Sequence, residues 1–178
     1  MDNGMIRAAE AFTGAGMPTD AAAVVLVEVD GTPAQVADEA ALVGRVAGEH
    51  GVRTIRVAQN DAERDLLWKA RKSAFGAMAR IAPNYYLHDT VVPRRRLPEV
   101  LREVYAITDR HGLMVMNVFH AGDGNLHPLI LYEANDPDQV HKAEAAGAEV
   151  LKLCVEVGGC LTGEHGVGVE KRDLMTSQ

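Results

Sequence analysis

Aromatic residues, cysteines and basic residues are all scarce in this chain of 178 residues. Phe, Trp and Tyr together make up only 4% of it, so a buried core must consist mainly of Ala, Val and Leu. Lys and Arg number 18 against 25 Asp and Glu, and the resulting formal charge of −7 argues against nucleic acid as a partner. The two cysteines, Cys154 and Cys160, fit neither a disulfide framework nor a zinc knuckle and indicate reduced thiols.

Long apolar runs are also missing from the sequence. No run approaches the roughly 18 residues that a membrane-spanning helix needs, and the N-terminal residues lack the apolar region of a signal peptide. Apolar residues nevertheless make up 47% of the chain, which excludes intrinsic disorder and is enough to form a core. Because no internal repeat or low-complexity linker is present, we predict a single domain over residues 1–178. The reduced thiols and the lack of a signal peptide predict a cytoplasmic location.

The hydrophobic pattern predicts interleaved strands and helices after a first 20 residues without clear period. Strands are expected over residues 22–29, 52–58, 85–92, 113–119 and 126–132. Helices are expected over residues 33–50, 60–83, 98–112 and 137–158. The last two strands follow each other without a helix between them, which argues against a purely parallel sheet. We therefore predict an α+β fold of ferredoxin-like type, with a mostly antiparallel sheet and helices packed on one face.

The densest group of polar residues, FHAGDGNLHP at 119–128, lies between those two strands. Its Asp-Gly pair at positions 123 and 124 is typical of a two-residue type I′ turn. Such a turn sets His120 directly opposite His127, with Cβ atoms about 4.5 to 5.5 Å apart, a separation that suits two imidazoles binding one metal ion. The alternative is that both histidines are ordinary residues beside a tight turn.

A second group, GGCLTGEHGVG at 158–168, has five glycines around the adjacent Glu164 and His165. Glycines allow a ligand to approach the backbone closely. The carboxylate is a candidate third metal ligand, and the imidazole is a candidate general base. The alternative for this group is a helix C-cap followed by a flexible loop.

Arg71 is the third candidate, because it lies among the apolar positions of the predicted helix 60–83. A guanidinium held there by its neighbours can form a two-pronged contact with a substrate carboxylate. The alternative is a surface arginine whose stem alone is buried.

Taken together, HAGDGNLHP and GGCLTGEHGVGVEKRDLM resemble the C-terminal, substrate-binding domain of FAD-linked oxidases of the vanillyl-alcohol-oxidase type. That group includes the glycolate oxidase flavoprotein subunit, D-lactate dehydrogenases and D-2-hydroxyglutarate dehydrogenase. The segment DLLWKARKSAFGAMARIAPNYYLHDTVVPRRRLPEV extends the resemblance over nearly the whole chain.

The resemblance assigns roles to five residues. It implies that His120, His127 and Glu164 bind a divalent metal such as zinc, manganese or iron. It implies that His165 is the base that takes the proton of the substrate hydroxyl, and that Arg71 binds the substrate carboxylate. The FAD is expected to be held mainly by an N-terminal flavin domain outside this sequence, so we expect the chain to be a fragment that is inactive alone.

The function that the resemblance implies is that of the substrate domain of an FAD-dependent 2-hydroxyacid oxidase or dehydrogenase. A glycolate- or D-lactate-type substrate is oxidised to a 2-oxo acid, with hydride transfer to FAD. The expected partners are this small 2-hydroxyacid, the protein's own flavin domain, and further oxidase subunits that carry electrons onward and attach the protein to the periphery of the inner membrane. The alternative function is a non-enzymatic, ferredoxin-like module that binds a small ligand or a metal.

Overall fold

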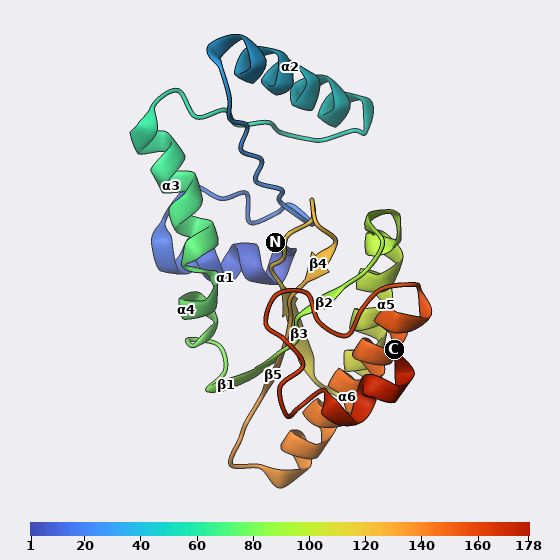
Figure 1. Cartoon of the computed structure of the whole chain (residues 1–178). Helices are drawn as coiled ribbons and strands as arrows, with labels where there is room; N and C mark the ends of the chain where they lie inside the picture. Colours follow the sequence, from blue (N-terminus) through green and yellow to red (C-terminus); the bar gives the residue numbers. More distant parts are fainter. The chain divides into compact units, whose positions relative to one another are not determined.

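The computed structural model describes all 178 residues, which divide into two compact units (Figure 1). The larger unit comprises Met1–Val24 together with Lys69–Gln178, and the smaller unit comprises Val25–Trp68. None of the helices combines the length and the apolar character that crossing a bilayer requires. All of the candidate site residues belong to the larger unit, which therefore decides the geometry of the site.

A three-stranded antiparallel sheet forms the centre of the larger unit. Its strands, in spatial order, are β1 (Asn84–Leu87), β5 (Pro128–Tyr132) and β3 (Met114–Asn117). A separate antiparallel pair consists of β2 (Thr90–Val91) and β4 (Asn125–Leu126). The predicted α+β class and antiparallel sheet are confirmed, whereas the narrower ferredoxin-like topology stays a prediction.

Helices pack on both faces of the three-stranded sheet rather than on the single face predicted (Figure 1). Successive residues of a strand point to opposite faces, and in β5 the residues 128–131 are all buried, so both faces must be covered. Ile130 packs into one apolar cluster, and Leu129 and Leu131 pack into the other. The covering helices are α5 (Leu97–Arg110) and α6 (Pro137–Glu156) on one side, and α1 (Asn3–Thr13) and α4 (Ala74–Met78) on the other.

Helix α1 lies in the segment for which the sequence pattern predicts no element. Its signals are nevertheless local: the Asp2 carboxylate caps the helix by accepting a hydrogen bond of 2.8 Å from the amide of Met5. Gly14 ends the helix in the left-handed region at φ 59°. Met5 and Ile6 are fully buried, so α1 supplies part of the core beneath the sheet.

The smaller unit contains α2 (Pro33–Glu49), which begins where the sequence predicts. Thr32 and Gln35 form the expected capping box: the Thr32 amide donates to Gln35 Oε1 at 3.0 Å, and the Gln35 amide donates to Thr32 Oγ1 at 3.4 Å. Helix α3 (Asp61–Lys72) leads from this unit into the larger one, and short 3₁₀ helices occupy Arg94–Arg96 and Arg172–Ser177.

The two strands predicted at residues 22–29 and 52–58 are wrong. Neither segment forms a strand, and the first makes only a single bridge, between Ala23 and Asp2. Val25 is 70% exposed and Val57 is 63% exposed. The β-branched residues of these segments favour a pleated, half-buried surface, but a strand also needs a neighbouring strand to pair with, and the pattern says nothing about the neighbour.

Three further predicted elements are each interrupted once. The strand predicted over 126–132 breaks at His127, which separates β4 from β5. The helix predicted over 60–83 breaks at Ser73, which separates α3 from α4. The strand predicted over 85–92 breaks at His88 and Asp89, which separate β1 from β2. Both residues are 1% exposed, so this interruption places two ionisable side chains in the interior.

His88 is a buried histidine whose ring nitrogens have no hydrogen-bond partner in the chain. Its ring meets that of Tyr86 edge-on at 4.3 Å between centroids, and a Cβ at Gly147 of α6 would lie 2.1 Å from Nε2. Burial, helped by the positive charge of Lys171, lowers the pKa of His88 to about 3. The imidazole is therefore neutral in the folded protein near pH 7.

Replacing His88 with leucine is expected to make the free energy of unfolding less sensitive to acid. The pKa of histidine is near 6.5 in an unfolded chain and about 3 for folded His88, so between these values the unfolded state binds more protons. Stability therefore falls as the pH is lowered through this range, by up to about 1.4 kcal/mol per pH unit. Urea unfolding near neutral pH and in mild acid measures the effect, with the exposed His141→Leu as control. An equal acid sensitivity in wild type and His88→Leu contradicts the prediction.

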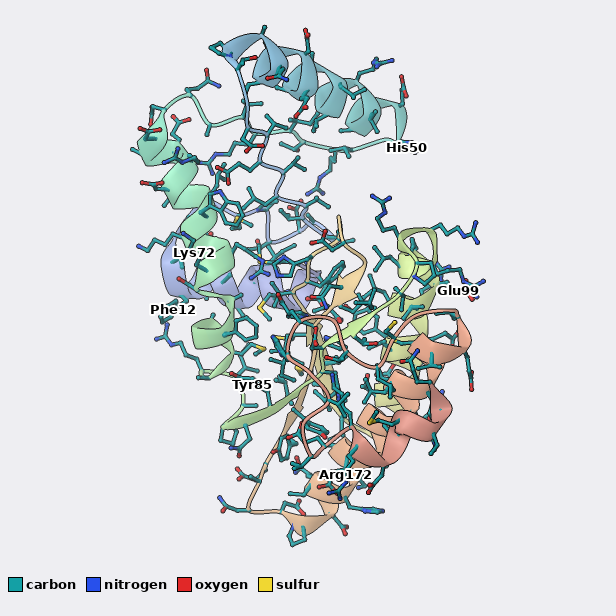
Figure 2. All side chains as sticks on the ribbon, viewed as in Figure 1. Phe12, His50, Lys72, Tyr85, Glu99 and Arg172 are labelled. Atoms are coloured by element: carbon teal, nitrogen blue, oxygen red, sulfur yellow. The ribbon has the colours of Figure 1, made fainter.

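Side chains of both units are drawn in Figure 2, where Tyr85 marks the edge of the sheet formed by β1. Its ring lies 6.2 Å from that of Phe75 on α4, so the edge strand is packed against the helix that follows α3.

Candidate functional site

The connection between β3 and β5 contains both candidate histidines, but its turn differs from the predicted one. Asn117 pairs with Pro128, and His120 forms a bridge with Asn125 rather than lying opposite His127. The connecting loop therefore has four residues, 121–124. The type I′ turn is wrong, because it needs a positive φ at Asp123 and only Gly124, at φ 73°, has one.

His120 and His127 still lie close together, although the observed register differs from the predicted one. A shift of one residue would turn one histidine to the opposite face, whereas the observed shift of two residues leaves every side chain on its own face. His120 and His127 are consequently diagonal neighbours, and their ring centroids lie 5.5 Å apart.

Glu164 reaches both histidines from the glycine-rich loop. Its Oε1 lies 2.8 Å from His127 Nε2 and 3.7 Å from His120 Nε2. His165 Nε2 is 3.8 Å from the same oxygen. Adjacent residues of an extended segment point apart, so this convergence requires the bend in the loop, in which Gly166 has φ 87°.

His127 is buried, whereas its neighbours His120 and Glu164 are exposed. The side chain of His127 is 4% exposed, whereas those of His120 and Glu164 are about half exposed, at 48% and 54%. Burial lowers the pKa of His127 to about 4, although the charge of Asp89 opposes the shift. His127 is thus a neutral imidazole near pH 7, which is the protonation state that binds metal ions.

The residues His120, His127 and Glu164 fit a divalent metal ion. Their ligand atoms all lie within 4.8 Å of one another, slightly more than the separation of at most about 4.2 Å for two atoms that are each about 2.1 Å from one ion. Binding would therefore draw these side chains slightly closer together, and the side chain of His120, which is 48% exposed, has room to move. Two imidazoles and a carboxylate suit zinc, manganese or iron. Three protein ligands also leave a coordination position open, as in catalytic metal sites.

Arg71 lies near this cluster, in the last turn of α3 and half-buried. Burial lowers the pKa of its guanidinium, and the negative charge of Glu164 opposes that shift, so the two side chains are within electrostatic reach of each other. The guanidinium nevertheless remains charged at any physiological pH, because arginine is not deprotonated in proteins. The structure therefore brings all five sequence-predicted residues into one region.

A hollow of about 290 Å³ adjoins the cluster. It is lined by Leu87, Asp89 and the loop residues 165–171, so His165 borders both the hollow and the cluster. The volume lies at the lower end of the range for ligand pockets, which favours a small ligand.

The residue on which the loop depends is Asp89, which the sequence analysis does not single out. It lies at the interruption between β1 and β2, and its carboxylate accepts hydrogen bonds from residues 162–165. A signal was present in the segment YYLHDTVV, because a carboxylate within an apolar strand must be buried with partners or turned out to water.

Comparison with known proteins gives a consistent result. Residues 1–178 match the family described as FAD linked oxidases, C-terminal domain. The chain is 48% identical over 178 residues to glycolate oxidase subunit GlcD of Escherichia coli K12, and 33% identical over 171 residues to GlcD of Bacillus subtilis 168. It is 28% identical over 183 residues to the probable mitochondrial D-lactate dehydrogenase of Danio rerio. These matches cover 96% to 100% of the chain but 36% of each relative, so the chain spans little more than a third of their length.

Proposed function

Because the chain belongs to the family of C-terminal domains of FAD-linked oxidases, we propose that residues 1–178 are the substrate-binding domain of an FAD-dependent 2-hydroxyacid oxidoreductase. The substrate is a small 2-hydroxyacid of the glycolate or D-lactate type, which is oxidised to the 2-oxo acid with hydride transfer to FAD. The relatives named as glycolate oxidase subunits and D-lactate dehydrogenases support this substrate class.

The partners of the chain follow from the same proposal. The FAD is held mainly by an N-terminal flavin domain, for which the greater length of the relatives leaves room. FAD, when bound, supplies the acceptor for two electrons. Further subunits carry the electrons onward and attach the protein to the periphery of the inner membrane.

The observation that carries the proposal is the convergence of an acid, three imidazoles and a guanidinium in one region. His120, His127 and Glu164 would hold the divalent ion, and such an ion, when bound, supplies a Lewis acid that lowers the pKa of a substrate hydroxyl. Arg71 binds the substrate carboxylate through two parallel N–H donors and so orients the substrate.

His165 is the proposed base for the hydroxyl proton. Its side chain is 46% exposed, so Nε2 is accessible to a substrate that sits at the cluster. Its distance of 3.8 Å from Glu164 is too long for a hydrogen bond, which leaves Nε2 available to accept the proton. The carboxylate and the imidazole therefore have separate roles although they are adjacent in sequence.

Steady-state oxidation of glycolate and D-lactate by the full-length flavoprotein, with an artificial electron acceptor, tests the function. We expect turnover with a 2-hydroxyacid and its loss on chelation of the metal. A protein that binds metal normally and is indifferent to every 2-hydroxyacid supports the alternative, a module that only binds a ligand.

In the full-length protein, Arg71→Lys is expected to raise KM about tenfold or more, with a smaller change in kcat. Lysine keeps the charge but is unable to reproduce a planar, two-pronged contact with a carboxylate. Arg110→Lys is a matched control, because Arg110 is exposed on α5 and pairs only with Glu149. Steady-state kinetics measure both variants, and an unchanged kcat/KM for Arg71→Lys returns Arg71 to the role of a surface arginine.

A further inference from the structure

One buried carboxylate holds the loop segment that carries both Glu164 and His165. Asp89 is 1% exposed, and its Oδ2 accepts hydrogen bonds from three successive backbone amides. The donors are the amides of Gly163 at 2.8 Å, Glu164 at 3.0 Å and His165 at 2.9 Å. Consecutive amides that point to one place form a concave site for an anion, and here a side chain of the same protein occupies that site.

Two side chains complete the set of donors around this carboxylate. Thr162 Oγ1 donates to Oδ2 at 2.8 Å, and Asn125 Nδ2 donates to Oδ1 at 2.6 Å. Thr162 Oγ1 in turn accepts from the Gly166 amide at 2.9 Å, which closes the bend from its other side. Burial raises the pKa of Asp89, but the hydrogen bonds lower it by more than burial raises it. The net pKa is well below the usual range, and the carboxylate stays charged.

The far end of the loop is attached to the same residue. Lys171 is 5% exposed, and its Nζ donates a hydrogen bond to the backbone carbonyl of Asp89. Nζ also lies 4.0 Å from Asp89 Oδ2, so the ammonium partly compensates the buried negative charge. Both ends of the segment 162–171 are thus bound to one residue, while the part between them lines the hollow.

The contact is too close for any residue other than glycine at position 163. A Cβ there would lie 1.9 Å from Asn125 Nδ2 and 2.8 Å from Asp89 Oδ1. Glycine at position 163 therefore allows the backbone amides of residues 163–165 to reach the Asp89 carboxylate.

We propose that Asp89 is the positioning residue of this site: by holding the segment 162–165 it directs Glu164 toward the two histidines and His165 toward the substrate. The inference rests on the proposed function for the roles of Glu164 and His165. Asp89 is 1% exposed and acts through the loop segment that it binds. A carboxylate is required, because asparagine has one acceptor oxygen and would set its own N–H donors against those of the loop.

Asp89→Asn in the full-length protein tests this with two measurements. Hydrogen exchange of the metal-free protein, followed by mass spectrometry, reports on the amides of 163–165. Titration with Mn²⁺, followed by EPR, reports on the metal affinity. We expect at least tenfold faster exchange in this segment and at least tenfold weaker Mn²⁺ binding. Asp109→Asn, an exposed residue of α5, is the matched control and is expected to change neither.

A second pair of variants applies if Asp89→Asn does not fold. Thr162→Val removes the hydroxyl that donates to Asp89 Oδ2, and Thr162→Ser keeps it. We expect the valine variant to bind Mn²⁺ more weakly and to exchange its loop amides faster, and the serine variant to restore both. A role confined to overall stability predicts no difference between these variants once both are folded.

The outcomes separate this inference from the proposed metal site. If the wild-type protein and His127→Ala bind Mn²⁺ equally, the metal assignment fails, and the exchange measurement still decides whether Asp89 holds the loop. A folded Asp89→Asn variant with wild-type exchange at 163–165 overturns the inference. So does a variant that loses this protection but keeps wild-type Mn²⁺ affinity, because Asp89 then does not position Glu164.

Discussion

Replacing His127 with alanine is expected to weaken the binding of a divalent metal ion by more than 100-fold. Loss of a residue that only supports a ligand typically costs 10- to 100-fold in metal affinity, and loss of a ligand is expected to exceed this. His127 is the candidate ligand closest to Glu164, at 2.8 Å, and the one that burial keeps neutral. Because of its short distance to Glu164 and its neutral imidazole, we expect His127 to contribute most to metal binding among the three candidate ligands.

Metal titration of the purified protein measures this effect. His141→Ala, an exposed histidine of α6, is the control for loss of an imidazole elsewhere. A thermal unfolding curve recorded without metal shows whether His127→Ala remains folded, since His127 is buried. Equal affinity in wild type and His127→Ala would remove His127 from the proposed metal site.

His165→Ala in the full-length flavoprotein is expected to lose turnover by about 10²- to 10⁴-fold, which is the usual contribution of a general base. The variant is expected to keep its metal and its flavin, because His165 is not among the three residues whose ligand atoms converge. Its side chain is 46% exposed, so truncation leaves no cavity in the core. Glu164→Ala, by contrast, is expected to lose both metal and turnover.

Metal analysis combined with single-turnover reduction of the flavin distinguishes the two variants. The adjacent pair Glu164 and His165 is a demanding test, since a general disturbance of the loop would affect both variants alike. If His165→Ala is isolated without metal, His165 is a ligand. If it reduces its flavin at the wild-type rate, His165 is not the base.

Much of the helical structure was predictable, because the signals for a helix end lie within a few residues of it. Thr32 and Gln35 are three residues apart, and the helix they cap begins as expected. The strands were less predictable, because a strand is completed by a partner that is distant in sequence. The segments 22–29 and 52–58 have suitable residues but no ladder, and the predicted strand 85–92 is divided where Asp89 meets the loop.

In the candidate site, too, the features that depend on local sequence were predictable, and those that depend on distant contacts were not. The candidate residues for metal binding and proton transfer were predictable from the motifs around residues 120–127 and 164–165, since residue types and glycine spacing are local properties of a sequence. The predicted direct pairing of His120 with His127 was wrong. The two side chains still lie on one face, because the register differs from the predicted one by an even number of residues.

The amino-acid sequence alone was enough to identify the family, the α+β class and the five candidate residues, because motifs, caps and hydrophobic periods depend on neighbours along the chain. Only the tertiary structure revealed that both faces of the sheet are covered, and that Asp89 binds amides of a loop 74 residues away. Contacts over such separations depend on how the strands and helices pack, and no local pattern encodes which amides a buried carboxylate meets.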